Sequence, residues 1–265
     1  MTLLTLEKRG HVGILTLNRP EMMNALGAPG DGDVVADVCA EVNADREIRC
    51  VILTGAGRAF SAGGDVKAMK ERTGAFGGNG VSIRDGYRGN IHKVVKAIYY
   101  LEVPSIAAVN GAAIGLGCDV ACMTDIRISS DQAKYGVTFL KLGIIPGDGG
   151  ALFLTRIVGA QRAAELTLTG RIVKADEAKA LGLLLEVTEP DALLPRAKEI
   201  ASKIASKPPQ AIRYAKRLLK LAQRQALEEH LDACSAFQAI CHKTEDHQEA
   251  LKAFFEKRPG KFTGA

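Results

Sequence analysis

The sequence predicts an α/β protein whose C-terminal part is entirely helical. Before Pro190, short apolar runs alternate with segments of helical periodicity, whereas after it only helical patterns occur. A unit of strand, glycine turn and helix also occurs twice, at residues 50–70 and 105–123. We therefore expect an α/β core of residues 1–190 and an all-helical region of residues 191–265.

The first elements follow from alternation and turn residues. Residues 3–7 and 12–17 alternate as two strands joined by a short turn, which is typical of a hairpin. Residues 18–33 are broken by prolines and glycines, so we expect a helix only over residues 34–42, with Asp31 or Asp33 as its N-cap.

The first glycine turn follows a strand at residues 50–54 and leads into a helix at residues 66–70. Four glycines in residues 73–80 then predict a mobile loop. Residues 83–101 have the pattern of one long helix that leads to the second glycine turn.

The second glycine turn predicts the floor of a binding pocket. Residues 105–109 are an apolar strand, the glycines follow, and Asp119 lies in the first turn of the next helix. Such a helix start presents free backbone N–H groups to a ligand. Together the two turns can direct two N–H groups at one oxygen, which is an oxyanion hole. The alternative is that their glycines only make tight turns.

The remaining elements complete the α/β pattern. Residues 126–129 and 183–187 are predicted strands, and residues 147–158 and 161–168 are predicted helices. The later helices are expected at residues 192–206, 210–222, 227–241 and 245–257, with Pro208-Pro209 separating the first two.

Composition excludes several classes of protein. The 265 residues suffice for one large core, and a net charge of +5 is too small to indicate nucleic-acid binding. We find no membrane-spanning run, no signal peptide, no phosphate loop, no nucleophile elbow and no metal-ligand spacing among the histidines. Six irregularly spaced cysteines predict reduced thiols, so we expect a cytoplasmic protein.

Five motifs resemble the enoyl-CoA hydratase/isomerase (crotonase) superfamily, in the family's order and across essentially the whole chain. They are residues 17–26, 58–65, 106–111, 142–150 and 253–258. The resemblance implies a crotonase-like spiral of repeated β-β-α units, assembled as a homotrimer or as a dimer of trimers. It also implies an acyl-CoA thioester as substrate, with coenzyme A as part of that substrate and no other cofactor or metal.

The resemblance assigns roles to individual residues. It places the two oxyanion-hole N–H groups at Ala62 and Leu116. Binding of coenzyme A and substrate is assigned to Arg58, Ala62, Gly63, Gly64, Asp65, Phe139, Phe254 and Lys257. For Arg58, the alternative to a phosphate contact is a solvated surface charge.

The acid–base residues depart from the family's hydratases, which hold one water between two glutamates. Asp119 corresponds to the first glutamate, whereas Phe139, which cannot move a proton, corresponds to the second. Asp148 is a substitute acid at a helix start, and it either faces the pocket or caps that helix. Asp119 itself is either the catalytic acid or only a favourable charge in a first turn.

Three hypotheses remain at this stage. The chain either shifts a double bond of an enoyl-CoA through an enolate, or hydrates the double bond with displaced carboxylates, or binds acyl-CoA without catalysis. The first two predict turnover of an unsaturated thioester, and the third predicts binding alone. Phe139 argues against hydration by the two-glutamate mechanism.

Overall fold

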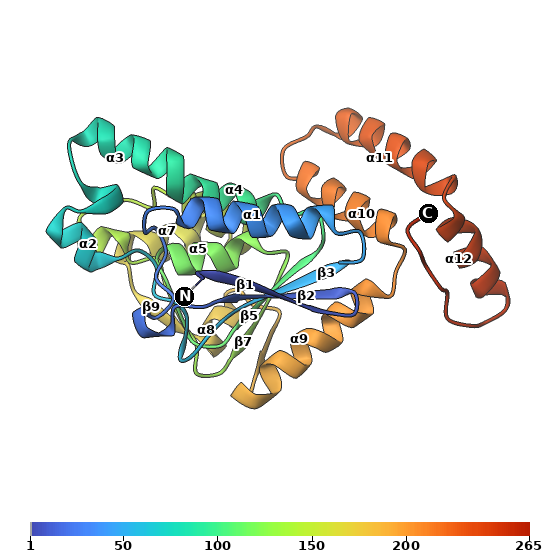
Figure 1. The fold of residues 1–265 in the computed structure, drawn as a ribbon, viewed down its shortest axis with the longest axis horizontal. Coiled ribbons are helices and arrows are strands. Elements are labelled where there is room, and N and C mark those ends of the chain that lie inside the picture. Colours follow the sequence, from blue (N-terminus) through green and yellow to red (C-terminus); the bar gives the residue numbers. More distant parts are fainter. Residues whose placement is uncertain (1) are drawn as a thin grey trace.

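The protein is described here by a computed structural model that covers residues 2–265. Two sheets and twelve α-helices form it (Figure 1). The strands are β1 (Leu4–Arg9), β2 (Val12–Leu17), β3 (Cys50–Gly55), β4 (Ala59–Ser61), β5 (Ser105–Val109), β6 (Ala112–Ile114), β7 (Ile126–Ser130), β8 (Lys134–Gly136), β9 (Ile172–Lys174) and β10 (Glu186–Thr188). The helices are α1 (Asp31–Ala44), α2 (Val66–Glu71), α3 (Gly80–Gly86), α4 (His92–Tyr99), α5 (Leu116–Met123), α6 (Gly150–Val158), α7 (Ala160–Thr169), α8 (Ala175–Ala180), α9 (Pro190–Ala205), α10 (Pro209–Leu221), α11 (Leu227–His242) and α12 (Glu245–Phe255).

The strand order confirms the predicted spiral of β-β-α units. One sheet has the order β1-β2-β3-β5-β7-β10 and the other has the order β4-β6-β8-β9. Three successive pairs, β3 with β4, β5 with β6 and β7 with β8, each place one strand in either sheet before the chain enters the next helical segment. All pairings within these two sheets are parallel except β1 with β2 and β8 with β9.

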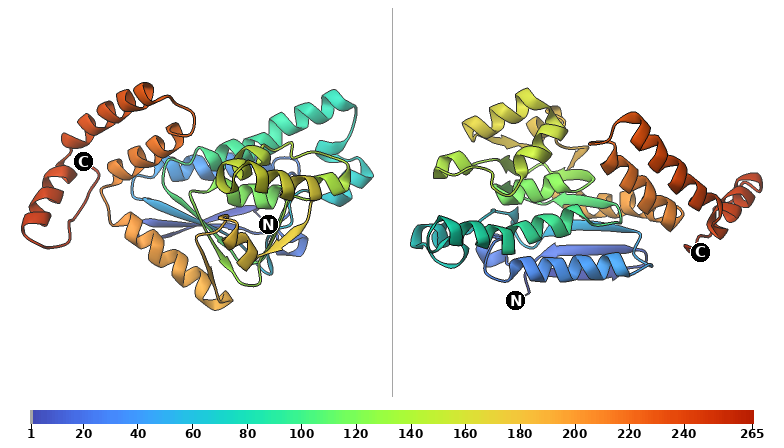
Figure 2. Two further views of the ribbon diagram at one scale, coloured as in Figure 1. Left: turned by 180° about the vertical axis from the view of Figure 1, so that it is seen from behind. Right: turned by 90° about the horizontal axis from the view of Figure 1, so that it is seen from above.

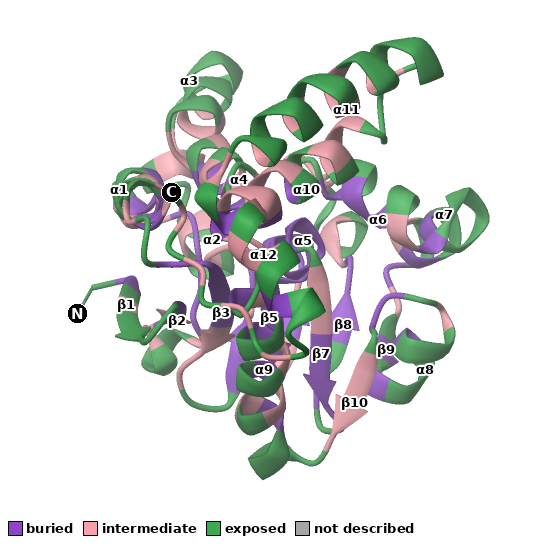
Figure 3. Cartoon of the chain, turned by 90° about the vertical axis from the view of Figure 1, so that its right-hand side faces the viewer, coloured by how far each residue is buried: buried purple, intermediate pink, exposed green. Residues whose placement is uncertain are grey.

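The large sheet is covered on both faces, which explains why β5 is buried at every residue. On one face it packs towards α1, α4 and α5, within the largest cluster of buried apolar side chains. On the other face α9 lies against it, with Ala197, Ala201 and Ala205 spaced one helical turn apart. Small side chains at these positions let a helix lie close to a sheet, and Figure 3 shows α9 over β5 and β7.

The packing of α9 bears on the predicted boundary between residues 190 and 191. Because α9 shares a core with β3, β5 and β7, that boundary separates a helix from the sheet that it covers. The helices that extend away from the core are α11 and α12 (Figures 1 and 2), whereas α10 is anchored to it by the buried Lys216. Of these, α11 packs on α10, where the rings of Tyr214 and Phe237 stack 4.8 Å apart.

Several local expectations need correction. The N-cap of α1 is Gly30, and the Asp31 carboxylate instead accepts hydrogen bonds from the backbone N–H groups of Gly27 and Ala28, both at 2.9 Å. The predicted helix at residues 83–101 is divided by a π-helical turn, Tyr87–Ile91. The predicted helix at 147–158 begins only at Gly150. Within residues 2–265, no helix is both long and apolar enough to cross a bilayer.

Candidate active site

The helix α5 is the buried floor around which the site is built. It follows the strand β6 through Gly115, and all eight of its residues are buried. Leu116 is its first residue, so its N–H is one of the donors that a helix leaves without an intrahelical partner. Asp119 lies in the same first turn and is 0% exposed.

The carboxyl group of Asp119 fills the space where a side chain on Gly150 would lie. A Cβ atom built on Gly150 would overlap this carboxyl group, so only glycine fits at the start of α6. Neither Asp119 oxygen meets a hydrogen-bond donor within residues 2–265. Beside it lies Asp148, which is 4% exposed and within hydrogen-bond reach of Asp119. Because an ionised carboxylate only accepts hydrogen bonds, the two can bond only when one is protonated.

Burial determines the electrostatics of this pair. The pKa of Asp119 lies well above its usual range because the group is desolvated and because Asp148 adds a second negative charge. Burial raises the pKa of Asp148 as well, against the opposing effect of its hydrogen bonds. Two carboxylates in contact in a low-dielectric site cannot both ionise readily, so the pair retains one proton where an isolated aspartate has lost it.

Whether Asp148 faces the pocket or serves the start of α6 stays a prediction. Its Oδ1 accepts a hydrogen bond from the Gly150 N–H at 3.2 Å, close to the start of α6, although the N-cap residue is Gly149. The same carboxyl group also faces Asp119.

The first glycine turn meets α5 at its N-terminus. Gly63 has a φ of +87°, and a Cβ atom there would overlap the Ile114 carbonyl oxygen and lie 3.3 Å from the Leu116 nitrogen. This close approach brings the turn against the free end of α5. The neighbouring Gly64 N–H has no acceptor within residues 2–265.

Ala62 requires a correction. Its backbone N–H donates to the Met23 carbonyl oxygen at 2.9 Å, so it is not free to bind a ligand oxygen. Asp65 is also occupied, because its Oδ1 caps α2 by accepting from the N–H groups of Lys67 and Ala68 at 2.9 and 3.0 Å. Arg58 is exposed, so either of its two predicted roles remains open.

A cavity of about 1280 Å³ adjoins the acid pair. Gly147 and His92 line it, and the His92 Nε2 lies 2.8 Å from the Gly147 carbonyl oxygen, next to Asp148 in the chain. Tyr87 lines it too, with its ring edge-on to those of His92 and Phe76. Burial and the charge of Asp148 raise the pKa of Tyr87.

Sequence reasoning missed Tyr87 and His92. In the π-helical turn, the His92 N–H bonds to the Tyr87 carbonyl oxygen five residues back, which is how these two residues come to share one wall. Single-turn π-helices are frequent at functional sites, but the residue types in this segment do not predict one.

The structure does not bring every predicted residue to this cavity. Phe139 is half-buried beside Gly115, with its ring 3.7 Å from where a Cβ atom on that glycine would lie, and it does not line the cavity. Phe254 and Lys257 lie at the end of α12, which is at the opposite end of the molecule from α2 and α3 (Figures 1 and 2). Within residues 2–265, no cluster of three side chains is suited to hold a metal ion.

Comparison with known proteins adds independent findings. Residues 7–265 match the family model described as enoyl-CoA hydratase/isomerase. The chain is 41% identical to the short-chain-enoyl-CoA hydratase of Clostridium acetobutylicum, over 96% of this chain and 94% of that protein. It is 36% identical to the crotonyl-CoA hydratase of Syntrophomonas wolfei, over 97% of this chain and 96% of that protein.

Solved structures agree with these sequence matches. The crystal structure of enoyl-CoA hydratase from Bacillus anthracis superimposes with a TM-score of 0.92 at 35% identity, covering 99% of this chain and all of that one. An enoyl-CoA hydratase/carnithine racemase from Magnetospirillum magneticum gives a TM-score of 0.89 at 33% identity, covering 100% of this chain and 97% of that one.

Proposed function

The chain belongs to the enoyl-CoA hydratase/isomerase family, and we propose that its Asp119–Asp148 pair moves a proton next to the carbonyl of a coenzyme A thioester. It is an acyl-CoA enzyme of this family. The observation that carries the proposal is the buried acid pair itself, which has one proton to give and one carboxylate to accept. The pair adjoins a cavity large enough for an acyl chain.

The proposed reaction is the shift of a double bond in an enoyl-CoA. The ionised member of the pair removes a proton from the carbon beside the thioester carbonyl, and negative charge moves onto the thioester oxygen. The double bond forms again when the carbon at the far end of the delocalised system takes up a proton. A carboxyl pair that shares a single proton suits this transfer, because the substrate loses one proton to the pair and gains one proton from it.

We propose that the N–H groups of Leu116 and Gly64 hold the oxyanion. Leu116 keeps the role expected from the sequence, and Gly64 takes the place of Ala62, whose N–H is bonded to Met23. The contact between the Gly63 turn and the Leu116 nitrogen supports this pairing. Losing one such donor typically lowers a rate by about a hundredfold or more. The coenzyme A chain is proposed to run along residues 62–65.

Hydration is the second candidate. The relatives from Clostridium acetobutylicum and Syntrophomonas wolfei are named hydratases, and their identity to this chain favours water as a co-substrate. Against the two-glutamate arrangement, Phe139 occupies the second position, so hydration here would need Asp148 to orient the water with Asp119. The two reactions give different products from one substrate.

The experiment is a panel of 2-enoyl-CoA and 3-enoyl-CoA thioesters in heavy water, with products identified by mass spectrometry. A shift gives an isomer whose mass rises only by the deuterium that it takes up, whereas hydration adds one molecule of water and gives a hydroxyacyl product. Leu116→Pro removes the proposed N–H donor and should lower turnover about a hundredfold, whereas Leu116→Ala keeps it and should remain active. Binding of every thioester with neither turnover nor exchange would instead support a silent acyl-CoA-binding protein.

We further propose that the active form is a homotrimer or a dimer of trimers, located in the cytoplasm. The helix α12 lies away from this chain's own cavity and carries Phe254 and Phe255, which are 77% and 78% exposed. Exposed aromatic residues of this kind are typical of an interface. Of the helical region 191–265, α12 can therefore cover the acyl-CoA cavity only across a subunit boundary, where Phe254 and Lys257 would meet the adenine end of a neighbour's ligand. Sedimentation as a monomer at micromolar concentration would contradict this assembly.

A further inference from the structure

The cavity beside the acid pair is lined by four cations and by no acidic residue. Lys70 and Arg72 come from the C-terminal end of α2, and Arg84 and Arg88 come from α3 and the π-helical turn. A surface with charges of one sign attracts and orients a ligand of the opposite sign. The ligand that fills this cavity is therefore expected to carry negative charge.

The cations lie away from the segment proposed to bind coenzyme A. That segment, residues 62–65, precedes α2 and does not line the cavity. Lys70 and Arg72 are at the other end of α2, a helix of six residues, and so are about 9 Å along its axis. Neither acid lines the cavity, but two of its lining residues lie close to Asp148: Gly147 precedes it in the chain, and Tyr87 has its pKa raised by the charge of Asp148. An acyl chain that passes the acid pair therefore enters the cavity with the cations still ahead of it.

Three of the four cations have no acidic partner. Arg84 pairs with Asp85 at 2.9 Å, whereas Lys70, Arg72 and Arg88 make no ion pair within residues 2–265. All are exposed, so each remains hydrated at the cavity rim. A carboxylate placed among them gains charge-assisted hydrogen bonds, and a guanidinium group can bind it through two parallel bonds.

The apolar lining explains where the rest of the acyl chain goes. Val66, Met69, Phe76, Ile83 and Ile144 line the same cavity. Apolar side chains of this kind suit a short hydrocarbon segment, and the cations suit a charged group at its end. The π-helical turn contributes to both the apolar and the cationic lining, since Tyr87 and Arg88 are neighbours in it and His92 follows its last residue.

We propose that the preferred acyl group carries a carboxylate at its far end, so that the substrate is the coenzyme A monothioester of an unsaturated dicarboxylic acid. Arg88, with Lys70 and Arg72, forms the subsite for that carboxylate. This inference rests on the proposed function, because it assigns the acyl end of the same site. The reacting carbons lie at the acid pair, and the distal carboxylate lies among the cations.

The test compares two substrates that differ only at the distal end. Pent-2-enedioyl-CoA carries the carboxylate, and pent-2-enoyl-CoA has the same number of carbons without it. We expect kcat/KM for the first to exceed that for the second by about tenfold or more, which corresponds to about 1.4 kcal/mol. Arg88→Gln should lower kcat/KM for the charged substrate by about tenfold and leave the neutral one within about twofold. Lys96→Gln, an equal charge change on α4 outside the cavity, is the matched control and should affect neither.

Binding measurements keep this inference separate from the proposed function. Calorimetry with the saturated thioesters glutaryl-CoA and pentanoyl-CoA should show the same preference for the carboxylate even in an enzyme that turns over neither unsaturated substrate. High ionic strength should weaken the preference, because the cations are exposed. Equal affinity for both thioesters, or an equal loss for both in Arg88→Gln, would overturn the subsite and reassign Arg88 to the coenzyme A phosphates or to the solvated surface. Turnover of pent-2-enoyl-CoA in that case would leave the proposed function intact.

Discussion

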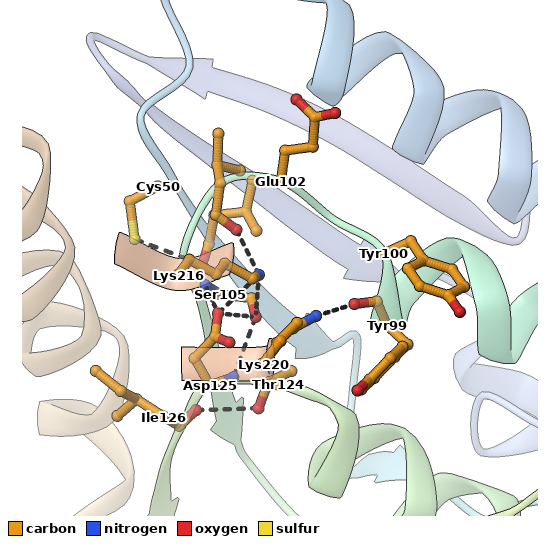
Figure 4. Close-up of polar contacts among 12 residues, drawn as sticks. Cys50, Tyr99, Tyr100, Glu102, Ser105, Thr124, Asp125, Ile126, Lys216 and Lys220 are labelled. Atoms are coloured by element: carbon orange, nitrogen blue, oxygen red, sulfur yellow. Dashed lines mark hydrogen bonds and ion pairs between the residues drawn. The ribbon is translucent and has the colours of Figure 1, made fainter. Parts of the chain in front are cut away.

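The buried carboxyl group of Asp119 has a second carboxyl group beside it, whereas the buried ammonium group of Lys216 is surrounded by acceptors. On α10, the Lys216 Nζ lies 2.7 Å from both the Asp125 Oδ2 and the Val103 carbonyl oxygen, and 3.4 Å from the Ser105 hydroxyl (Figure 4). Asp125 in turn accepts from the backbone N–H and the hydroxyl of Ser105, at 2.7 and 2.8 Å. On α5, Asp119 has no donor among the described residues.

The difference separates a structural cluster from a reactive one. Burial lowers the pKa of Lys216, but the Asp125 carboxylate opposes this effect and keeps the charged form stable in place. Nothing compensates Asp119 in the same way, since both burial and Asp148 raise its pKa. An uncompensated buried acid costs stability, and such groups occur where a reaction needs a proton held at an unusual pKa.

The largest expected effect is on stability, at the compensated cluster. Lys216→Met leaves the Asp125 carboxylate without its cation, and breaking a buried pair in this way costs about 3–5 kcal/mol. We expect a value near the lower limit, because the Asp125 side chain is 27% exposed and keeps its bonds to Ser105. Urea unfolding measures this loss. The exposed pair of Lys203 and Glu199 provides the control, since Lys203→Met should cost less than about 1 kcal/mol.

A double variant sharpens the interpretation of that result. Lys216→Met combined with Asp125→Asn removes both charges and should recover part of the lost stability. Turnover per folded molecule should remain near that of the wild type, because Lys216 lies outside the cavity of the acid pair. A loss of stability below about 1 kcal/mol in Lys216→Met would contradict the structural role of this cluster.

The second effect is on catalysis, at the uncompensated pair. Asp119→Asn removes one carboxyl group of the proton-transferring pair with almost no change of volume, so turnover and α-proton exchange should fall by about a hundredfold or more. Acyl-CoA affinity should hold, since the amide keeps the volume of the carboxyl group. Rapid-quench kinetics and calorimetry measure the two quantities separately. Full exchange activity in this variant would place the base elsewhere, with Asp148 as the first candidate.

Asp148→Asn tests whether the two acids act as a pair. The amide oxygen can still accept from the Gly150 N–H, so stability should change by less than about 1 kcal/mol. Turnover should fall by about tenfold to a hundredfold. Removing the neighbouring charge also lowers the pKa of Asp119, so the acid limb of the pH–rate profile should move to lower pH. Wild-type turnover would show that Asp148 is only structural and that Asp119 acts alone.

Much of the fold was predictable because it is encoded locally. The hairpin, the strands beside the two glycine turns and the C-terminal helices follow from periodicity and from Gly and Pro positions. Leu116 and Asp119 could be placed at the start of a helix for the same reason. The proximity of Asp148 to Asp119 depends on α6 packing against α5, which no local pattern records.

The remaining features of the site depend on contacts between distant segments. Ala62 and Gly64 are two residues apart in the same turn, and only the bond from the Ala62 N–H to Met23 distinguishes them. The π-helical turn places Tyr87 and His92 on one wall of the cavity, and its amino-acid composition does not distinguish it from an ordinary α-helix. The Lys216 cluster joins α10 to residues near β5 and β7 that are 91 to 113 positions away, so its partners could not be read from the sequence.

The smallest expected effect is on the pH dependence of stability, and its sign differs from that of ordinary surface acids. The pKa of Asp119 is raised in the native state, so between about pH 4 and that raised pKa the native state binds more protons than the unfolded chain. The free energy of unfolding therefore falls as pH rises through this window. For one group the slope is at most about 1.4 kcal/mol per pH unit. Asp119→Asn removes this slope, so its stability relative to the wild type should increase from pH 5 to pH 8 in urea unfolding. Asp45, whose pKa is lowered by a hydrogen bond from Lys8, is the control, because Asp45→Asn changes protonation only below about pH 4. If the stability of Asp119→Asn had the same slope against pH as that of the wild type, the acid pair would already be ionised in the native state. The contrast with Lys216 would then be lost.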